Sequence, residues 1–260
     1  MNLTWQERRA AARDYFRKSG YELRYYPAPG GKKASFALIA PGGGYATVCT
    51  AIEGEPFAKE LNKRGYSAFI VYYRVKKEAR HPAPLDDMAR ALKEILDNAE
   101  KWNVRTEGFS VWGSSAGGHL AACFGTESIG YVRYGLPKPA AMVLVYPVIT
   151  MGRHTHKGSR NNLLGKNASP ETRERLSVEN LVTGQYPSTY IWNTLEDKTV
   201  PPVNGQLFAE AAEKAGIVYQ YRQYQTGAHG CGLAKGLECE SWFDEAVAFW
   251  QAQIIKETTE

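Results

Sequence analysis

The chain has 260 residues, of which 43% are hydrophobic and 23% are charged. This composition fits one large globular domain or two small ones, with enough apolar side chains for a sizeable core. The net charge of +5 is small and dispersed, which argues against a nucleic-acid-binding protein. No apolar run approaches the roughly 20 residues that a membrane span requires.

The N-terminal segment is charged and helix-prone, and it lacks the apolar core of a signal peptide. Four cysteines occur, at positions 49, 123, 231 and 239. None of them forms a C-x-x-C pair, and no group of histidines and cysteines has the spacing of a zinc site. We therefore expect a cytoplasmic protein with free thiols and no bound metal.

Strand-like and helix-like segments alternate along the chain. Strands are predicted for residues 21–26, 35–40, 67–73, 109–112, 140–146, 188–194 and 218–224. Helices are predicted for residues 5–17, 53–63, 85–101, 116–124, 203–215 and 241–255. Several strands are near-continuous apolar runs, which is typical of a sheet covered by helices on both faces. The alternation predicts an α/β fold with a mostly parallel, doubly wound sheet of about seven or eight strands.

Residues 150–185 interrupt this alternation. The segment is polar, and its basic residues include Arg153, His154, His156, Lys157, Arg160 and Lys166. A long insertion in a compact domain is usually functional or disordered. We expect a single domain over residues 1–260, with residues 150–185 as a short cap-like insertion over an active site. The alternative is a solvated excursion with short helices.

A Gly-x-Ser-x-Gly motif places Ser115 between Gly113 and Gly117. An apolar strand precedes the motif and a helix-compatible run follows it, so the serine lies on a strand–turn–helix junction. A nucleophile on such a sharp turn needs glycines beside it, since a Cβ atom there would collide with the backbone. The motif alone occurs often by chance, so the prediction depends on its partners.

A serine hydroxyl needs an adjacent base. His229 follows the last predicted strand, where a base belongs, whereas His119 lies one helical turn below Ser115 and is expected to pack. Asp197 follows the strand 188–194 and is the expected partner of His229, with Glu196 as its rival. The chain order of serine, aspartate and histidine is the order of an α/β-hydrolase.

The developing oxyanion needs N–H donors that are fixed in advance. Ala116, directly after the serine, supplies one of them. A glycine-rich loop follows the strand 35–40, and we expect Gly43 and Gly44 to supply the others. The loop does not match a phosphate-binding loop, because no Gly-Lys-Ser or Gly-Lys-Thr follows it.

These elements together resemble the α/β-hydrolase fold family over nearly the whole chain. Four motifs look like the small bacterial esterase branch that is often labelled acetyl xylan esterase: residues 41–45 (PGGGY), 53–56 (EGEP), 72–75 (YYRV) and 117–121 (GGHLA). Residues 146–149 (YPVI) and 155–165 in the insertion are similar to that branch too. One difference is Pro41, where many relatives in the wider lipase and esterase group have histidine.

The resemblance implies a serine carboxylic-ester hydrolase that forms an acyl-enzyme and deacetylates a small acetylated carbohydrate. No cofactor is expected. We assign Tyr45, His156 and Arg160 to substrate binding, although the aromatic and basic residues of this region could equally serve packing. Two alternatives stay open: an arylformamidase or peptide-like amide hydrolase with the same residues, and a non-catalytic binding protein. The expected partner is a small-molecule ester rather than nucleic acid or membrane, and the sequence leaves a homo-oligomer open.

Overall fold

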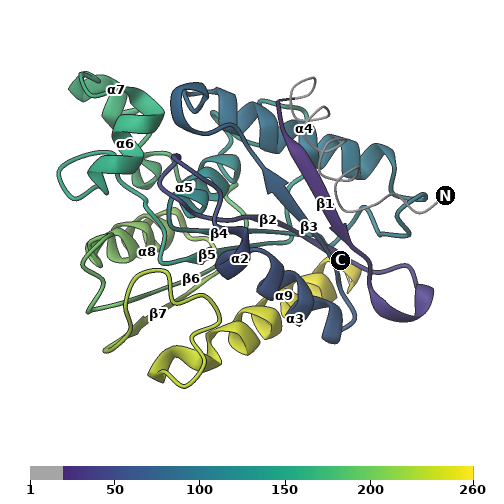
Figure 1. Cartoon of the computed structure of the whole chain (residues 1–260). Coiled ribbons are helices and arrows are strands. Elements are labelled where there is room, and N and C mark those ends of the chain that lie inside the picture. Colours follow the sequence, from purple (N-terminus) through teal and green to yellow (C-terminus); the bar gives the residue numbers. More distant parts are fainter. Residues whose placement is uncertain (1–19, 260) are drawn as a thin grey trace.

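Seven strands form one sheet in the computed structural model, which describes residues 20–259. The strands are β1 (Glu22–Tyr26), β2 (Phe36–Ala40), β3 (Ser67–Tyr72), β4 (Ser110–Ser114), β5 (Ala141–Val145), β6 (Thr189–Thr194) and β7 (Tyr219–Tyr224). Their spatial order is β1-β3-β2-β4-β5-β6-β7, as the crossing ribbons in Figure 1 show. Strand β1 pairs antiparallel with β3, and all other pairs are parallel.

The central strands are apolar along their whole length because both faces of the sheet are covered. Every residue of β2, β4 and β5 is buried. Leu38 of β2 lies between Phe69 of β3 and Val111 of β4 in the register of the sheet. A fully buried parallel strand of this kind has no solvent face and so shows no alternation of polar and apolar residues.

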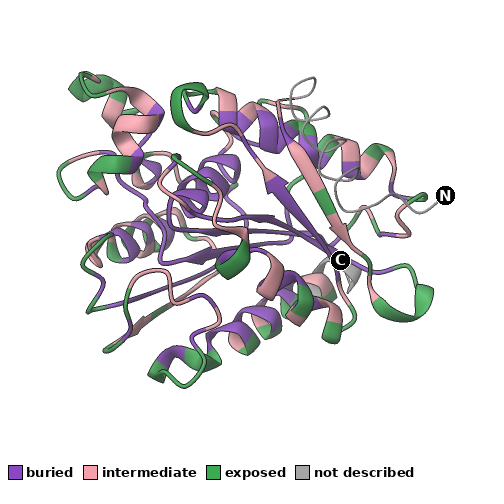
Figure 2. Ribbon diagram, viewed as in Figure 1, coloured by how far each residue is buried: buried purple, intermediate pink, exposed green. Residues whose placement is uncertain are grey.

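Helices cover the two faces of this sheet (Figure 1). The described helices are α2 (Thr50–Glu53), α3 (Glu55–Lys63), α4 (Ala83–Asp97), α5 (Ser115–Phe124), α6 (Lys157–Leu164), α7 (Pro170–Glu174), α8 (Val203–Ala215) and α9 (Trp242–Thr259). Side chains of α4, α5 and α8 share one apolar core with the sheet, and those of α3 and α9 share a second core on the opposite face. Buried residues concentrate on the strands and on the helix faces that meet them (Figure 2).

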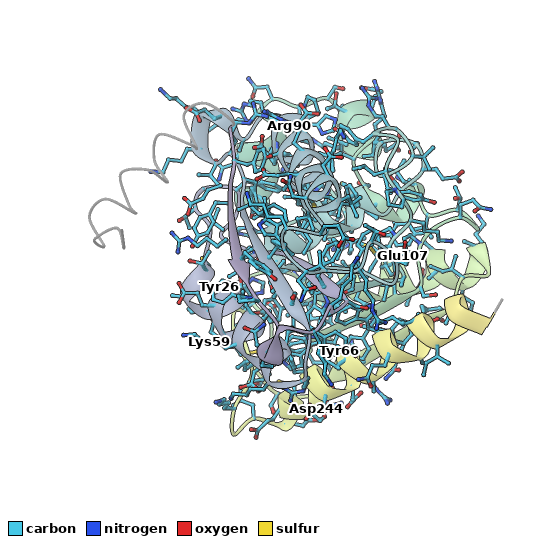
Figure 3. The ribbon with its side chains drawn as sticks, turned by 90° about the vertical axis from the view of Figure 1, so that its right-hand side faces the viewer. Tyr26, Lys59, Tyr66, Arg90, Glu107 and Asp244 are labelled. Carbon is cyan, nitrogen blue, oxygen red and sulfur yellow. The ribbon has the colours of Figure 1, made fainter. Side chains whose placement is uncertain are left out.

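The C-terminal helix α9 also packs against the segment around α3. Arg64, at the end of α3, forms an ion pair with Asp244, and the ring of Tyr66 lies on Trp250 with centroids 4.4 Å apart. Figure 3 labels Tyr66 and Asp244 on this side of the molecule. Within residues 20–259, no helix combines the length and the apolar character that crossing a membrane requires.

The predicted fold class is confirmed, and each of the seven predicted strands is present. The single helix predicted for residues 53–63 is wrong in one detail, since Gly54 separates α2 from α3. Pro56 stands in the first turn of α3, where its missing N–H needs no helical partner, so a new helix begins there. The predicted helix at residues 5–17 lies outside the described residues.

Candidate active site

Ser115 lies at the sharp junction between β4 and α5. Its φ angle of 53° is in the left-handed region, which a residue with a Cβ atom rarely adopts. The flanking glycines allow the turn: a Cβ atom on Gly113 would lie 2.2 Å from the carbonyl oxygen of Gly117, and one on Gly117 would lie 2.1 Å from that of Ala40. The motif therefore requires glycine at both positions for steric reasons.

His229 links Ser115 to Asp197 by two hydrogen bonds. Its Nε2 atom lies 2.8 Å from Ser115 Oγ, and its Nδ1 atom lies 2.6 Å from Asp197 Oδ2. Because Nδ1 faces a carboxylate, it carries the proton, and Nε2 is left to accept from the serine hydroxyl. The Asp197 side chain is 1% exposed, so water does not compete with the imidazole for this carboxylate.

Backbone N–H groups fix the orientation of Asp197. Its other oxygen, Oδ1, accepts hydrogen bonds from Thr199 N–H at 2.8 Å and from Val200 N–H at 2.9 Å. The adjacent Glu196 points elsewhere, and its carboxylate accepts from Gly227 N–H at 3.2 Å. Of the two acidic residues considered in the sequence, only Asp197 contacts the imidazole ring.

The glycine-rich loop after β2 lies beside Ser115, and three side chains hold it. Tyr73 donates to the carbonyl of Pro41 at 2.6 Å, and Asn162 donates to that of Gly44 at 2.9 Å. Glu53 accepts from Gly42 N–H at 2.7 Å. Within the described part of the chain, the N–H groups of Gly43 and Gly44 donate to no protein acceptor. They are therefore available to a ligand, as is the N–H of Ala116 in the first turn of α5, which has no intrahelical partner.

A pocket of about 380 Å³ opens at Ser115. Gly43, Gly44, Glu53 and His229 line it, together with an apolar wall of Ala46, Cys49 and Ile52. The segment 150–185 contributes His156, Gly158 and Asn162 to the same lining. One side of the pocket thus comes from the polar segment that interrupts the strand–helix alternation.

His156 is the N-cap of α6, and this role defines which ring nitrogen carries the proton. Its Nδ1 atom accepts from Ser159 N–H at 3.3 Å and lies 2.8 Å from the Ser159 hydroxyl. Burial lowers the pKa of His156, and the nearby His229 lowers it further, which favours a neutral ring. A neutral ring that accepts at Nδ1 has its proton on Nε2, so His156, which lines the pocket, has one ring N–H donor.

Two of the residues predicted to bind substrate, Tyr45 and Arg160, do not line this pocket. Tyr45 is 1% exposed, and its hydroxyl bonds to Nδ1 of His119 at 3.0 Å. Its φ of 57° turns the chain inward after the glycines, so the ring packs under the loop. Arg160 donates to the carbonyls of Met151 and Gly152 and lines a different pocket.

His119 is buried beneath the turn, as its position one helical turn below Ser115 predicts. Its Nε2–H donates to the carbonyl of Leu176 at 2.8 Å, while Nδ1 accepts from Tyr45. Burial lowers the pKa of His119 to about 4. Neither this link to the segment 150–185 nor the contacts of Glu53 and Asn162 with the glycine loop were predicted from the sequence. For Glu53, the only signal in the sequence was its position at the start of the EGEP motif, residues 53–56.

A mostly parallel sheet of this order, with a serine, a histidine and an aspartate hydrogen-bonded in series beyond its strands, defines an α/β-hydrolase. The model of the BD-FAE family matches residues 24–212. This match spans more than half of the chain, and the chain belongs to the BD-FAE family.

Two similar proteins act on xylan according to their names. Endo-1,4-beta-xylanase B of Butyrivibrio fibrisolvens is 35% identical over 219 residues, which are 81% of this chain and 34% of that protein. Acetylxylan esterase of Xylanibacter ruminicola is 34% identical over 208 residues, which are 78% of this chain and 41% of that protein. The chain thus spans well under half the length of these two relatives.

Solved structures show the same architecture. The acetyl ester-xyloside bifunctional hydrolase from Caldicellulosiruptor lactoaceticus superposes with a TM-score of 0.82 at 34% identity, covering 89% of this chain and 88% of that one. The carboxylesterase Cest-2923 from Lactobacillus plantarum shares the fold at 23% identity, with a TM-score of 0.77 and coverage of 90% and 92%. The fold and these relatives place the chain among the esterase-type α/β-hydrolases.

Proposed function

We propose that the chain is a serine carboxylic-ester hydrolase in which Ser115 is the nucleophile, His229 the general base and Asp197 the residue that orients the base. The observation that carries this proposal is the unbroken series of hydrogen bonds from Ser115 through His229 to Asp197, at 2.8 and 2.6 Å. A serine hydroxyl reacts at neutral pH only when such a base accepts its proton. The esterases among the similar proteins support the same assignment.

The proposed reaction has two halves. Ser115 Oγ attacks the ester carbonyl while its proton moves to Nε2 of His229, and the tetrahedral oxyanion accepts hydrogen bonds from Gly43, Gly44 and Ala116. The C–O bond of the ester then breaks, and His229 returns the proton to the leaving alcohol. In the second half, a water molecule gives a proton to His229 as it attacks the acyl-enzyme. The bond to Ser115 Oγ then breaks, His229 returns the proton to that oxygen, and the acid leaves.

The substrate that we propose is a small acetylated carbohydrate. The apolar wall of Ala46, Cys49 and Ile52 suits a short acyl group, and the Nε2–H donor of His156 suits a hydroxyl-rich leaving group. Two similar proteins are named for acetyl ester cleavage, the acetylxylan esterase and the acetyl ester-xyloside hydrolase. We further propose that residues 150–185 act as a cap-like insertion whose pocket residues contact the sugar.

The experiment compares p-nitrophenyl esters of rising chain length with acetylated xylo-oligosaccharides. We expect the highest kcat/KM for acetyl groups, with release of acetate from the oligosaccharides. Ser115→Ala should lower kcat on the order of a million-fold, the scale observed when a serine nucleophile is lost. A preference for long acyl chains would contradict the acetylesterase proposal, and faster cleavage of a formylated arylamine would favour the amide hydrolase instead.

A further inference from the structure

Glu53 is a buried carboxylate beside Ser115 that the proposed reaction does not use. It is the last residue of α2, is 4% exposed and lines the pocket. Its Oε2 atom accepts from Gly42 N–H at 2.7 Å, and Gly42 in turn lies between this carboxylate and the serine. A Cβ atom on Gly42 would lie 2.7 Å from Glu53 Oε2 and 2.8 Å from Ser115 Cβ.

The second oxygen of Glu53 reaches the opposite side of the site. Oε1 accepts from the hydroxyl of Tyr146 at 2.8 Å. That hydroxyl accepts from Gly232 N–H at 3.2 Å, three residues after His229, and the Tyr146 ring lies edge-on to the His229 ring with centroids 5.0 Å apart. One carboxylate therefore connects the glycine loop after β2 with the loop that carries the histidine.

Burying a carboxylate is unfavourable unless strong partners compensate it. None of the ion pairs formed within residues 20–259 involves Glu53, so hydrogen bonds replace the usual Lys or Arg partner. If Glu53 only filled space, an uncharged side chain of the same size would serve equally well. The geometry instead matches a double acceptor, because only an ionised carboxylate accepts on both oxygens without donating.

We infer that Glu53 is a positioning residue, which holds the oxyanion loop through Gly42 and the histidine loop through Tyr146 in one fixed relation. The inference rests on the proposed ester hydrolase function. The N–H groups of Gly43 and Gly44 directly follow the anchored Gly42, so the anchor controls where they point. Donors that are fixed in advance stabilise the transition state more than the bound substrate.

The charge of Glu53 fits this role as well. Burial raises its pKa above the ordinary value for a glutamate, and the hydrogen bonds from Tyr146 and Gly42 and the charge of His229 offset only part of that rise. When His229 becomes an imidazolium during the reaction, the ionised carboxylate of Glu53 is a second negative charge near the ring, besides that of Asp197. The other titratable groups near the carboxylate are Tyr73, Cys49 and Cys231, and all three are uncharged when protonated.

Glu53→Gln tests the inference, with Glu55→Gln as the matched control on α3. The glutamine oxygen can still accept from Gly42 N–H, but its amide group cannot accept the Tyr146 proton. We expect kcat on p-nitrophenyl acetate to fall about tenfold to a hundredfold, which is at most the smallest loss seen on removing one oxyanion donor, because the donors are displaced and not removed; KM should change less than about twofold. Glu55 is a half-buried residue that forms ion pairs with Arg24 and Lys59 and does not line the pocket, so Glu55→Gln should keep the parental values.

Tyr146→Phe provides a second test, because it removes the hydrogen bond from the tyrosine hydroxyl to Glu53 and leaves the one from Gly42. It should also lower kcat at constant KM, and the double variant should be less impaired than the product of the two single effects. If Glu53→Gln does not fold, the kcat of a folded Tyr146→Phe protein tests the inference instead. Parental kcat in the folded variants, or a loss confined to KM or to the melting temperature, would overturn the inference. A parental protein without ester turnover would instead reject the proposed function on which it rests.

Discussion

Ser115 has a backbone conformation that favours glycine. A left-handed φ on a residue with a Cβ atom costs about 1–2 kcal/mol. The surrounding structure offsets that cost, since the carbonyl of Ser115 accepts from Val148 N–H at 3.0 Å and the glycines at positions 113 and 117 leave room for the turn. Strain maintained at one polar residue in a pocket is consistent with its proposed role as nucleophile.

Asp197→Asn should lower kcat about ten-thousand-fold, because the wrong imidazole tautomer is then favoured. The asparagine oxygen would accept from Thr199 and Val200, so its amide group would face His229 and donate to Nδ1. The remaining proton would then lie on Nε2, directed at Ser115. Steady-state kinetics on p-nitrophenyl acetate measures the loss. Glu196→Gln is the control, since glutamine can still accept from Gly227, and near-normal activity of Asp197→Asn would shift the role to Glu196.

His119 should make stability depend on pH in a defined window. Its pKa is about 4 in the folded chain, against about 6.5 in the unfolded chain, so only the unfolded state binds a proton between these values. The stabilisation is complete above pH 6.5 and is lost as the pH falls towards 4, by up to about 3 kcal/mol. Urea unfolding of the parent and of His119→Gln at pH 7, 5.5 and 4.5 measures the difference. Parallel pH curves for the two proteins would contradict this assignment.

The placement of the candidate site residues was predictable from the sequence where a short motif and a strand end coincide. Ser115 has its two glycines, and Asp197 and His229 each follow a predicted strand. Tyr45 follows the glycine-rich loop after a strand, but its left-handed φ turns the ring into the core. The sequence around Tyr45 does not predict that turn. Glu53 lies in a helical run with other charged residues, so its burial arises only when the chain folds.

At the scale of elements, the strands and the long helices follow from apolar patterning, whereas α6 and α7 do not. These two helices have eight and five residues, which is too short to stand without tertiary support. Side-chain caps start both of them, from His156 and Ser169. Their contacts with the rest of the chain join residues far apart in sequence, such as Asn162 and Gly44, which are 118 positions apart, and local patterning cannot predict such contacts.

Asn162→Ala should lower kcat about fivefold with little change in KM. The substitution removes the hydrogen bond from α6 to the carbonyl of Gly44, and one neutral hydrogen bond contributes about 1 kcal/mol. Without it, the oxyanion loop keeps its backbone hydrogen bonds and the side-chain hydrogen bonds of Tyr73 and Glu53. Asn161→Ala is the neighbouring control, because only the backbone of Asn161 makes hydrogen bonds among the described residues. Equal kcat values for the two variants would show that α6 does not position the loop.

For the whole molecule, the topology explains why residues far apart in sequence meet. The proposed nucleophile follows β4, its aspartate and histidine follow β6 and β7, and the glycine loop follows β2, so all four lie beyond the carboxyl ends of parallel strands. Two apolar cores hold the sheet between its helices and make that edge a rigid frame. Alternation of strands and helices was enough to predict this arrangement. The leaving group is less predictable, because the pocket side that would contact it belongs to the segment 150–185, which has no periodic pattern.

The most direct test of the account is active-site labelling with a fluorophosphonate, which bonds covalently to an activated serine. Mass spectrometry of the digested protein then locates the modified residue. We predict a single phosphonylated site at Ser115, complete loss of labelling in Ser115→Ala and loss of p-nitrophenyl acetate turnover in step with labelling of the parent. A label at another residue, or parental turnover by a fully labelled protein, would contradict the account.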